Sequence, residues 1–413
     1  MISVIEARDS ILELISPLGV ERVDIISGQG RVLAENIYAT RNQPPWDNSA
    51  MDGYAVRAAD TIPSPPDNYV ELEIIEDLPA GYQANRAVKP GQATHIMTGA
   101  PIPKGADAIV RTERATRVEP KLVRILEPVD TGTDLRKTGE DIRDGDLMLV
   151  SGKLLRAAEV GLLASTNRAY IPVYRRPRVA ILSTGDEIVD MDTPLIDGKI
   201  VDSNGYTLTA LVADAGAVPI RLGICPDNQE ALEQAILDGL VADIIITSGG
   251  VSVGEYDFVK GALEAVGTSM EFWKVNMTPG RPLAFGTIND AIVFGLPGNP
   301  VASMVTFELF VRPALLRMQG YTHIYRRTVK AILEEDLTKS LHRKQFIRVN
   351  LEKRGDTFFA SKTGAQGSGI LKSMALADGL AISHEDQEFM MAGDIIEVML
   401  LGGYSDLSID RNC

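Results

Sequence analysis

The chain has 413 residues, roughly two to four times the usual size of a single domain, so it should hold several hydrophobic cores. Hydrophobic residues make up 45% of it and charged residues 23%, which is ordinary for a folded globular protein and excludes a disordered chain. The formal charge of -15 repels polyanions at long range, so we expect no nucleic-acid partner.

The cysteines, the histidines and the hydropathy pattern exclude further classes. Cys225 and Cys413 are too few for a disulfide framework or a structural zinc site, and the four histidines form no zinc-binding pattern. Any bound metal should therefore have oxygen ligands. No apolar run has the length of a signal-peptide core or a membrane span. We expect a cytoplasmic protein without membrane attachment.

In the first half of the chain, the sequence pattern changes from helical to strand-rich and back to helical. Apolar spacing predicts an amphipathic helix over 4–18, which Gly19 ends. From 20 to 143, short apolar pieces alternate with Pro and Gly clusters, which is typical of a strand-rich module. Helical periodicity returns at 155–165, so we expect the strand-rich module to be an insertion within a first domain.

A basic, Pro-containing turn at 174–178 marks the start of a new core. Beyond it, strands and helices alternate, which favours a parallel sheet with helices on both faces. We expect strands at 179–183, 218–225, 243–248, 270–275 and 291–296, and helices at 203–215, 228–240, 256–266 and 300–319. Asp227 should cap the second helix, with Glu230 three residues later. Strand patterns at 346–351, 358–360 and 395–401 predict a C-terminal β domain.

Three loops of the α/β region carry unusual sequences. Ligands of open α/β sheets bind beyond the carboxyl ends of the strands, where these loops should lie. The first reads STGDE from Ser183 to Glu187, with hydroxyls and two carboxylates. The second, from 248 to 257, reads SGGVSVGEYD, and its glycines let backbone N–H groups approach an anion. Glu255 and Tyr256 stand where a P-loop needs Lys and Ser or Thr, which excludes such a kinase or GTPase. The third, GLPGNP at 295–300, is a stiff turn at the same edge.

Each candidate also has a plain structural interpretation. Thr-Gly-Asp and Gly-Gly turns are common in α/β proteins, but three at one sheet edge favour a site. Lys274, Arg281 and Arg348 could gather around an anion or could be solvated surface charges. The inserted module adds the segments 47–55, 97–101 and 136–141, in which Asp52-Gly53 could instead form a hairpin turn.

Together these segments resemble the molybdopterin molybdenumtransferase family, called MoeA in bacteria and found as the E domain of gephyrin in animals. The motifs stand in the family's order over nearly the whole chain: DNSAMDGYAV at 47–56, MTGAPIPKGADAIV at 97–110, GEDI at 139–142, STGDEIV at 183–189, SGGVSVGEYDFVK at 248–260 and GLPGNPVAS at 295–303. The resemblance implies a multidomain α/β plus β fold. Its four domains would be an elongated, helical first domain (1–26 and 144–175), an inserted strand-rich domain (27–143), a doubly wound, molybdopterin-binding α/β domain (176–322) and a C-terminal, β-barrel-like domain (323–413).

The resemblance also implies an enzyme that converts adenylylated molybdopterin and molybdate to molybdenum cofactor and AMP, with a divalent ion such as Mg²⁺, as a homodimer. A molybdopterin adenylyltransferase would be the partner that supplies its substrate. The catalytic carboxylates would be Asp52, Asp141, Glu187, Asp227 and Asp257. The substrate would be bound by Thr98, Arg136, Ser183, Thr184, Gly249, Gly250, Ser252, Lys274, Arg281, Pro297, Gly298, Pro300, Arg348 and Ser368.

Charge divides the expected site in two. Mg²⁺ is commonly held by one or two carboxylates and substrate phosphates, and the candidates are Asp227 and Asp257, with Glu187 as an outer-shell or proton-transfer alternative. Molybdate is a dianion and would lie among Lys274, Arg281, Arg348 and Ser368. Thr278 and Ala302 depart from the family, since many members have a lysine and a serine there, so the molybdate pocket should have fewer anion contacts.

Two other functions remain to be distinguished. A nucleotide pyrophosphatase would share the STGDE and SGG loops, but it would not need the motifs at 47–56 and 97–101 or the C-terminal β domain. A non-catalytic interaction scaffold would normally carry a fused partner domain or linker. The motifs favour the transferase.

Overall fold

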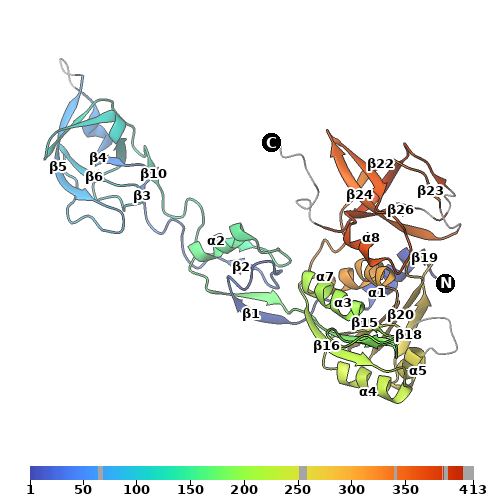
Figure 1. The fold of residues 1–413 in the computed structure, drawn as a ribbon. Helices are drawn as coiled ribbons and strands as arrows, with labels where there is room; N and C mark the ends of the chain where they lie inside the picture. The colour runs from blue at the N-terminus through green and yellow to red at the C-terminus, as the bar shows by residue number, and fades with distance from the viewer. Residues whose placement is uncertain (64–67, 251–257, 339–341, 384, 386–388, 403–413) are drawn as a thin grey trace. The chain divides into compact units, whose positions relative to one another are not determined.

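The computed structural model describes residues 1–63, 68–250, 258–338, 342–383, 385 and 389–402 (Figure 1). The chain forms two compact units, unit 1 with Met1–Glu21 and Tyr174–Cys413, and unit 2 with Arg22–Val173. Asp257 and Ser252, two of the expected site residues, lie outside the described residues. No helix in the described part of the chain combines the length and the apolar character needed to cross a membrane.

Unit 2 is rich in strands, as expected. Its main sheet has the order β7-β4-β6-β5-β9-β8. These strands are β4 (Gly53–Val56), β5 (Val70–Leu78), β6 (Gln92–Ile96), β7 (Ala108–Arg111), β8 (Ala115–Glu119) and β9 (Leu122–Ile125). The other elements of the unit are β2 (Ile37–Tyr38), β3 (Asn48–Ser49), β10 (Leu135–Arg136), β11 (Leu147–Leu149), α2 (Ala157–Ser165) and the short 3-10 turns Ala58–Thr61 and Thr112–Arg114. Strands β1 (Val20–Asp24) and β12 (Tyr170–Tyr174) lie where the two units join in the sequence.

The hairpin alternative for Asp52-Gly53 is wrong. The strand before this dipeptide, β3, pairs with β10, whereas the strand that begins at Gly53, β4, pairs with β6 and β7. Glycine is required here for a different reason, because a Cβ on Gly53 would lie 2.1 Å from the carbonyl oxygen of Val110. The close approach of β4 and β7 therefore explains this glycine.

Unit 1 contains a six-stranded sheet of order β16-β13-β17-β21-β20-β18. The strands are β13 (Arg178–Thr184), β16 (Val218–Cys225), β17 (Ile244–Ser248), β18 (Ser269–Lys274), β20 (Pro282–Ile288) and β21 (Ala291–Leu296). Four of them are parallel as expected, but β20 runs antiparallel to β18 and β21. The expectation of a parallel sheet is therefore wrong at this edge. The two-residue connection Asn289-Asp290, with Asn289 at φ 51°, makes a hairpin of β20 and β21.

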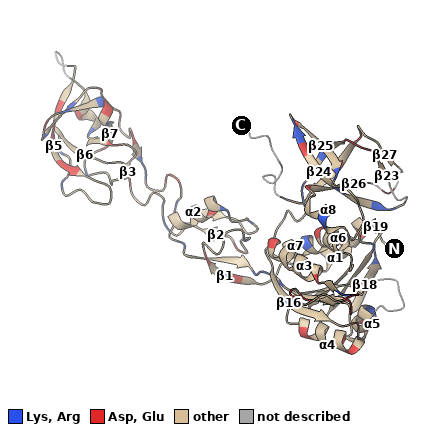
Figure 2. Cartoon of the chain, in the orientation of Figure 1, with Lys and Arg blue, Asp and Glu red and all other residues tan. Residues whose placement is uncertain are grey.

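Helices cover both faces of this sheet, so the doubly wound architecture is confirmed. One face packs against α1 (Val4–Glu13), α3 (Ser203–Asp214), α6 (Pro300–Thr306) and α7 (Arg312–Met318), and the other against α4 (Gln229–Gly239) and α5 (Phe258–Ala265). The first helix ends at Glu13, earlier than expected, and the nearby Pro17 disfavours a longer helix. Helix α4 carries three acidic residues, Glu230, Glu233 and Asp238, and no basic residue. Acidic positions are red on this helix in Figure 2.

The helix expected over 300–319 is interrupted. A π-helical turn, Phe307–Val311, separates α6 from α7. A π turn bonds i to i+5 and so disturbs the regular α-helical pattern of carbonyl partners. The carbonyl oxygen of Leu309 accepts a hydrogen bond from Nε of Arg8 in α1 (3.3 Å). Glu308, also in this turn, is buried and pairs with Nε of Arg326 at 2.9 Å.

The C-terminal part of unit 1 is a closed five-stranded barrel, which confirms the expected β-barrel-like region. Its strands are β22 (Thr328–Leu333), β24 (Lys344–Arg354), β25 (Thr357–Lys362), β26 (Gly379–Ser383) and β28 (Ile395–Leu400). They pair in the order β24-β25-β22-β28-β26, and the pairing of β26 with β24 closes the ring. Short elements attach to it, namely β19 (Met277–Thr278), β23 (Leu337–Thr338), β27 (Phe389–Met390) and α8 (Leu371–Ala375).

Candidate functional site

Unit 1 contains a cavity of about 710 Å³ at the carboxyl ends of its parallel strands. Thr184 ends β13, Ser248 ends β17, and Pro297 follows β21. Residues from the C-terminal part of unit 1 complete the lining, among them Gln345 of β24 and Ser368, which lies between β25 and α8. The chain leaves β13 for β16 on one side and later returns to β17 on the other, so the cavity lies at the point where the strand order reverses. Such a reversal is where open α/β sheets bind ligands.

The three loops singled out in the sequence meet in this cavity. Its lining includes Thr184, Gly249, Gly250, Pro297, Gly298 and Pro300. Ser183 is buried instead, and its hydroxyl donates to Oδ2 of Asp202 at 2.9 Å. Asn204, which the sequence analysis did not identify, joins two of the loops, because its Nδ2 donates to Oγ of Ser248 (2.9 Å) and to the carbonyl oxygen of Gly298 (2.8 Å).

Carboxylates gather on one side of the cavity. Glu187 and Asp227 line it, and the backbone N–H of Asp227 donates to Oδ1 of Asp186 at 3.2 Å. Partial burial raises the pKa of Asp227, and the neighbouring charges of Asp186 and Glu187 raise it further. A cation placed here would relieve this repulsion.

Asp227 is not the cap of α4, so that prediction is wrong. The helix starts one residue later than the capping prediction assumed, and Oδ1 of Asn228 accepts the hydrogen bond from the N–H of Ala231 (3.0 Å). The carboxylate of Asp227 is therefore not used in capping. It is one of the groups that line the cavity.

The acidic side suits a magnesium ion that a substrate helps to hold. Within the described ranges, no group of three or more His, Cys, Asp or Glu side chains is arranged to hold a metal by itself. Mg²⁺ does not need such a group, because it commonly binds one or two carboxylates together with substrate phosphates. The hard oxygen donor of Asp227 and its surplus negative charge fit this ion.

Cationic and neutral polar groups also line the cavity. Arg281 and Ser368 lie there as expected, and so does Arg343, which the sequence analysis missed because its loop shows no periodic pattern. Nε of Arg281 is buried and lacks a hydrogen-bond partner within the described structure. A buried donor of this kind is costly unless an acceptor reaches it, which suits an anionic ligand.

The two departures from the family pattern both lie at the cavity. Thr278 and Ala302 belong to its lining, so Thr278 is not on a distant surface. Ser303, one position after Ala302, is buried, and its N–H donates to the carbonyl oxygen of Asn299 (2.9 Å). Among the residues described as lining the cavity, Ser303 is absent, so it does not replace a serine at 302.

Lys274 and Arg348 are not part of the described lining. Lys274 is half-buried at the end of β18, opposite Pro282. Arg348 is 0% exposed, and burial lowers the pKa of its guanidinium. Its Nη2 donates to the carbonyl oxygens of Ala365 (3.2 Å) and Gly367 (3.1 Å). Arg348 thus supports the segment that carries Ser368 to the cavity.

The remaining candidates lie in unit 2. Asp52 and Thr98 are brought together, and Oδ1 of Asp52 accepts hydrogen bonds from both the N–H and the hydroxyl of Thr98. Arg136 is exposed on β10, opposite Asn48. Asp141 is exposed, and its N–H donates to the carbonyl oxygen of Gln43 (3.0 Å).

Every part of the chain that carries these motifs matches a known family model. Three family models match, described as MoeA N-terminal region (domain I and II) at residues 2–167, probable molybdopterin binding domain at 180–317, and MoeA C-terminal region (domain IV) at 330–401.

Individual relatives are similar over nearly their full lengths. A protein from Nostoc sp. named molybdopterin molybdenumtransferase is 41% identical over 387 residues, which is 92% of this chain and 88% of the relative. Molybdopterin molybdenumtransferase 2 of Mycobacterium tuberculosis is 39% identical over 405 residues, 96% of this chain and 99% of the relative. Two crystal structures of the molybdopterin biosynthesis protein MoeA from Pyrococcus horikoshii, each 32% identical, have TM-scores of 0.84 and 0.80 and cover 98% and 97% of this chain and 100% of their own.

Proposed function

Because the chain belongs to the molybdopterin molybdenumtransferase family, an enzyme family that inserts molybdenum in molybdenum cofactor biosynthesis, we propose that its cavity binds adenylylated molybdopterin and molybdate and releases AMP. The observation that supports this reaction is the presence of both acidic and basic side chains on the lining of one cavity. Carboxylates of Glu187 and Asp227 lie on its lining together with the guanidinium groups of Arg281 and Arg343.

The cationic groups would bind the oxyanions. Molybdate and the substrate phosphates are acceptors without donors, so they can satisfy the buried Nε of Arg281. Arg343 and the hydroxyl of Ser368 add donors at the same cavity. A planar guanidinium can donate two parallel hydrogen bonds to one oxyanion, which favours a defined orientation. Lys274 would contribute only long-range charge, and Arg348 would act through the segment that it supports.

The carboxylates would serve the phosphate side of the substrate. We assign Mg²⁺ to Asp227, and to Asp257 by family position, with Glu187 in proton transfer. Bound Mg²⁺ would neutralise charge on the phosphoanhydride. Asp227 and Asp257 would hold it, and Glu187 would accept or donate the proton that accompanies departure of AMP. The proposal also keeps five residues whose roles follow from their positions in the family motifs. They are Asp52, Thr98, Arg136 and Asp141 of unit 2, and Ser252.

Several broader statements belong to the same proposal. They are a homodimer, delivery of the substrate by a molybdopterin adenylyltransferase, a cytoplasmic location, and the four-domain division at 1–26 with 144–175, 27–143, 176–322 and 323–413. The resemblance of the motifs supports the homodimer, the delivery of the substrate and the domain division, and the low cysteine content supports the cytoplasmic location. The family models support the order of the domains, since they describe an N-terminal region with domains I and II and a C-terminal region with domain IV.

One reaction tests the proposal. Purified protein is incubated with adenylylated molybdopterin, molybdate and Mg²⁺, and AMP release is followed together with the activity of the cofactor that forms. We expect both products, and we expect neither from ordinary nucleotides. Hydrolysis of ordinary nucleotides without molybdopterin would instead support the pyrophosphatase, and the absence of any turnover would support a scaffold.

A further inference from the structure

Residues 185–202, which include Glu187, form one wall of the cavity, and we call this segment the cavity wall. Its strands β14 (Ile188–Val189) and β15 (Ile200–Val201) pair with each other and stand outside the six-stranded sheet. The N–H of Ile200 donates to the carbonyl oxygen of Glu187 (2.8 Å), and the N–H of Asp202 donates to that of Val189 (2.9 Å). Because these bonds lie within the wall, they do not attach it to the rest of unit 1.

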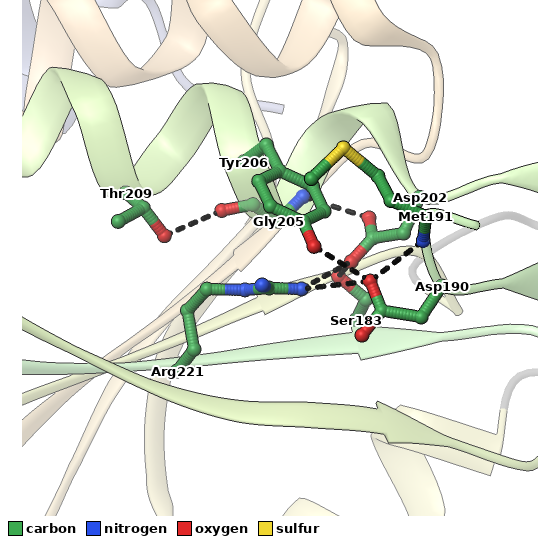
Figure 3. Close-up of polar contacts among 8 residues, drawn as sticks. All are labelled: Ser183, Asp190, Met191, Asp202, Gly205, Tyr206, Thr209 and Arg221. Atoms are coloured by element: carbon green, nitrogen blue, oxygen red, sulfur yellow. Dashed lines mark hydrogen bonds and ion pairs between the residues drawn. The ribbon is translucent and has the colours of Figure 1, made fainter.

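Asp190 provides an attachment. Its Oδ1 accepts hydrogen bonds from the hydroxyl of Tyr206 (2.8 Å) and the N–H of Met191 (2.9 Å), and it lies 3.5 Å from Nη2 of Arg221. Tyr206 belongs to α3 and Arg221 to β16, and both side chains point toward Asp190 (Figure 3). One carboxylate of the wall is thus held by a helix and a strand of the α/β body.

Arg221 joins this attachment to the start of α3. Its guanidinium carbon lies 3.9 Å from the centroid of the Tyr206 ring, and its Nη2 lies 3.7 Å from Oδ2 of Asp202. The side chain of Asp202 is 1% exposed and caps α3, with Oδ1 accepting from the N–H of Gly205 at 2.7 Å. Only glycine fits at 205, because a Cβ there would lie 2.3 Å from Oδ2 of Asp202. The guanidinium of Arg221 therefore contacts two carboxylates of the wall, one directly after each of its two strands.

Strand β16 has a β-bulge next to Arg221. Ile181 and Leu182 are consecutive in β13, yet their partners in β16 are Arg221 and Gly223, so Leu222 is an extra residue in the pairing. A bulge of this kind changes the direction of the side chains beside it, and bulges are common next to functional sites. Leu222 packs into the core on the side of α4 and α5, while Arg221 contacts α3 on the opposite face.

We propose that Arg221 is a positioning residue for the transfer reaction, and that it acts by holding the cavity wall through Asp190, Tyr206 and Asp202. The inference rests on the proposed function, because the wall presents Ile188 and Val201 to the cavity that would receive adenylylated molybdopterin. When the wall leaves this position, a smaller fraction of the protein molecules can bind the substrate. The apparent affinity for the substrate falls in proportion to that fraction. Once substrate is bound the wall is back in place, so KM should change and kcat should not.

The test uses the full-length chain with two single variants that break the attachment differently. Arg221→Met keeps an unbranched side chain over the Tyr206 ring but removes the charge. Asp190→Asn keeps the acceptor for Tyr206 and Met191, loses the ion pair and leaves the contact of Arg221 with Asp202 intact. The double variant measures whether the two act together. Thr209→Val is the matched control, because Thr209 is also on α3 and its hydroxyl donates to the carbonyl oxygen of Gly205 (2.6 Å), away from the wall.

Two measurements are made. Hydrogen exchange of the Gly185 amide, which donates to the carbonyl oxygen of Cys225 in β16 (3.3 Å), should be about tenfold faster without substrate in both single variants and unchanged in Thr209→Val. KM for adenylylated molybdopterin should rise about fivefold to tenfold, with kcat within about twofold of the unmodified protein. The double variant should be no worse than Arg221→Met alone, because both changes break the same contact.

The outcomes separate the inference from the function on which it rests. If both single variants exchange as slowly as the unmodified protein, or if their effects on KM multiply, the holding role of Arg221 is wrong. If exchange accelerates while KM stays constant, or if kcat falls instead, Arg221 holds the wall without positioning it for substrate, and the inference is wrong. Absence of AMP release from the unmodified protein would overturn the proposed function, and the exchange rates would still report on the attachment.

Discussion

A single carboxylate oxygen of Asp52 accepts two hydrogen bonds from Thr98, one from its backbone N–H and one from its hydroxyl, each 2.7 Å long. The backbone hydrogen bond and then the hydroxyl lower the pKa of this exposed carboxyl. The two residues come from different segments, one just before β4 and the other just after β6. The pair therefore fixes both the ionisation and the direction of Asp52.

Replacing Thr98 with valine tests this arrangement. Thr98→Val keeps the backbone donor and the shape but removes the hydroxyl, so the pKa of Asp52 should rise while staying below its ordinary value. Thr98→Ser retains a hydroxyl and serves as the control. The measurement is an NMR titration of the Asp52 carboxyl carbon. Equal pKa values for Asp52 in the two variants would mean that the hydroxyl contributes nothing.

Asp227 and Asn228 are neighbours with separable roles. Asp227→Asn should reduce magnesium-dependent AMP release by at least about 100-fold, since several kcal/mol of charge stabilisation would be lost. The midpoint of thermal unfolding should not fall, because the substitution removes a charge that Asp186 and Glu187 repel.

Asn228→Ala is the matched control for Asp227→Asn. It removes the cap of α4 and should cost about 1 kcal/mol of stability, lowering the midpoint by a few degrees, with AMP release within about twofold. If Asp227→Asn proved as active as the unmodified protein, Asp227 would leave the proposed metal site. A stable Asn228→Ala variant would contradict the assignment of the cap.

Thr278 offers a test of the oxyanion side. Because it lines the cavity, Thr278→Lys should place a cation near the molybdate dianion and lower the molybdate concentration for half-maximal cofactor formation. The effect should shrink at high salt, and AMP release without molybdate should change little. Thr116→Lys adds the same charge on an exposed strand of unit 2 and should have no effect. An unchanged molybdate requirement at both salt concentrations would exclude Thr278 from the oxyanion site.

Glu159 should make unit 2 sensitive to acid. This buried carboxylate contacts Arg156 (3.0 Å) and Lys153 (3.2 Å), and hydrogen bonding from Arg156 is the main cause that lowers its pKa to about 2. Because the pKa is lower in the folded protein, the ionised carboxylate stabilises the fold at pH values above its ordinary pKa of 4.5. This stabilisation is lost as the pH falls through about 2.

The measurement compares the free energy of unfolding at pH 5 and pH 2.5 in urea. Trp46 reports on unit 2 once Trp273, the other tryptophan, is replaced by phenylalanine. The parent should lose more stability than Glu159→Gln between these pH values, since glutamine does not titrate. The same pH dependence in both proteins would show that Glu159 is not the group responsible.

The proposed homodimer is tested by light scattering. At micromolar concentration we expect twice the mass of the 44.7 kDa chain, in the same fractions that release AMP. Fully active fractions with the mass of a monomer would contradict a dimeric enzyme.

Periodicity predicted the layers of unit 1 well because its strands are short apolar runs between helical patterns. It missed β20, which begins with Pro282 and lies one short turn before a strand of similar composition. It also treated 300–319 as one helix. Every residue of the π turn Phe307–Val311 is buried, so the hydrophobic pattern there has no polar face that could reveal a change of period.

The cavity was predictable where polar or glycine residues stand at the end of a strand or directly after it, as at Thr184 and Gly249. Asn204 and Arg343 were not, because the first follows a helix start and the second a loop without a pattern. The attachment of the cavity wall was equally hidden. Asp190 and Arg221 lie on separate elements, and in the sequence each is one charged residue among many. Three-dimensional contact, and not local pattern, defines these residues.

The π turn between α6 and α7 bears on how the chain tolerates a one-residue insertion. A turn bonded from i to i+5 accommodates about one residue more than an α-helical turn, so a one-residue insertion can be absorbed where it occurs. The buried faces of α6 and α7 then keep their phase, even though the spacing along the chain differs by one. The π turn therefore separates the helix that begins at Pro300, at the cavity, from the helix that leads to the barrel.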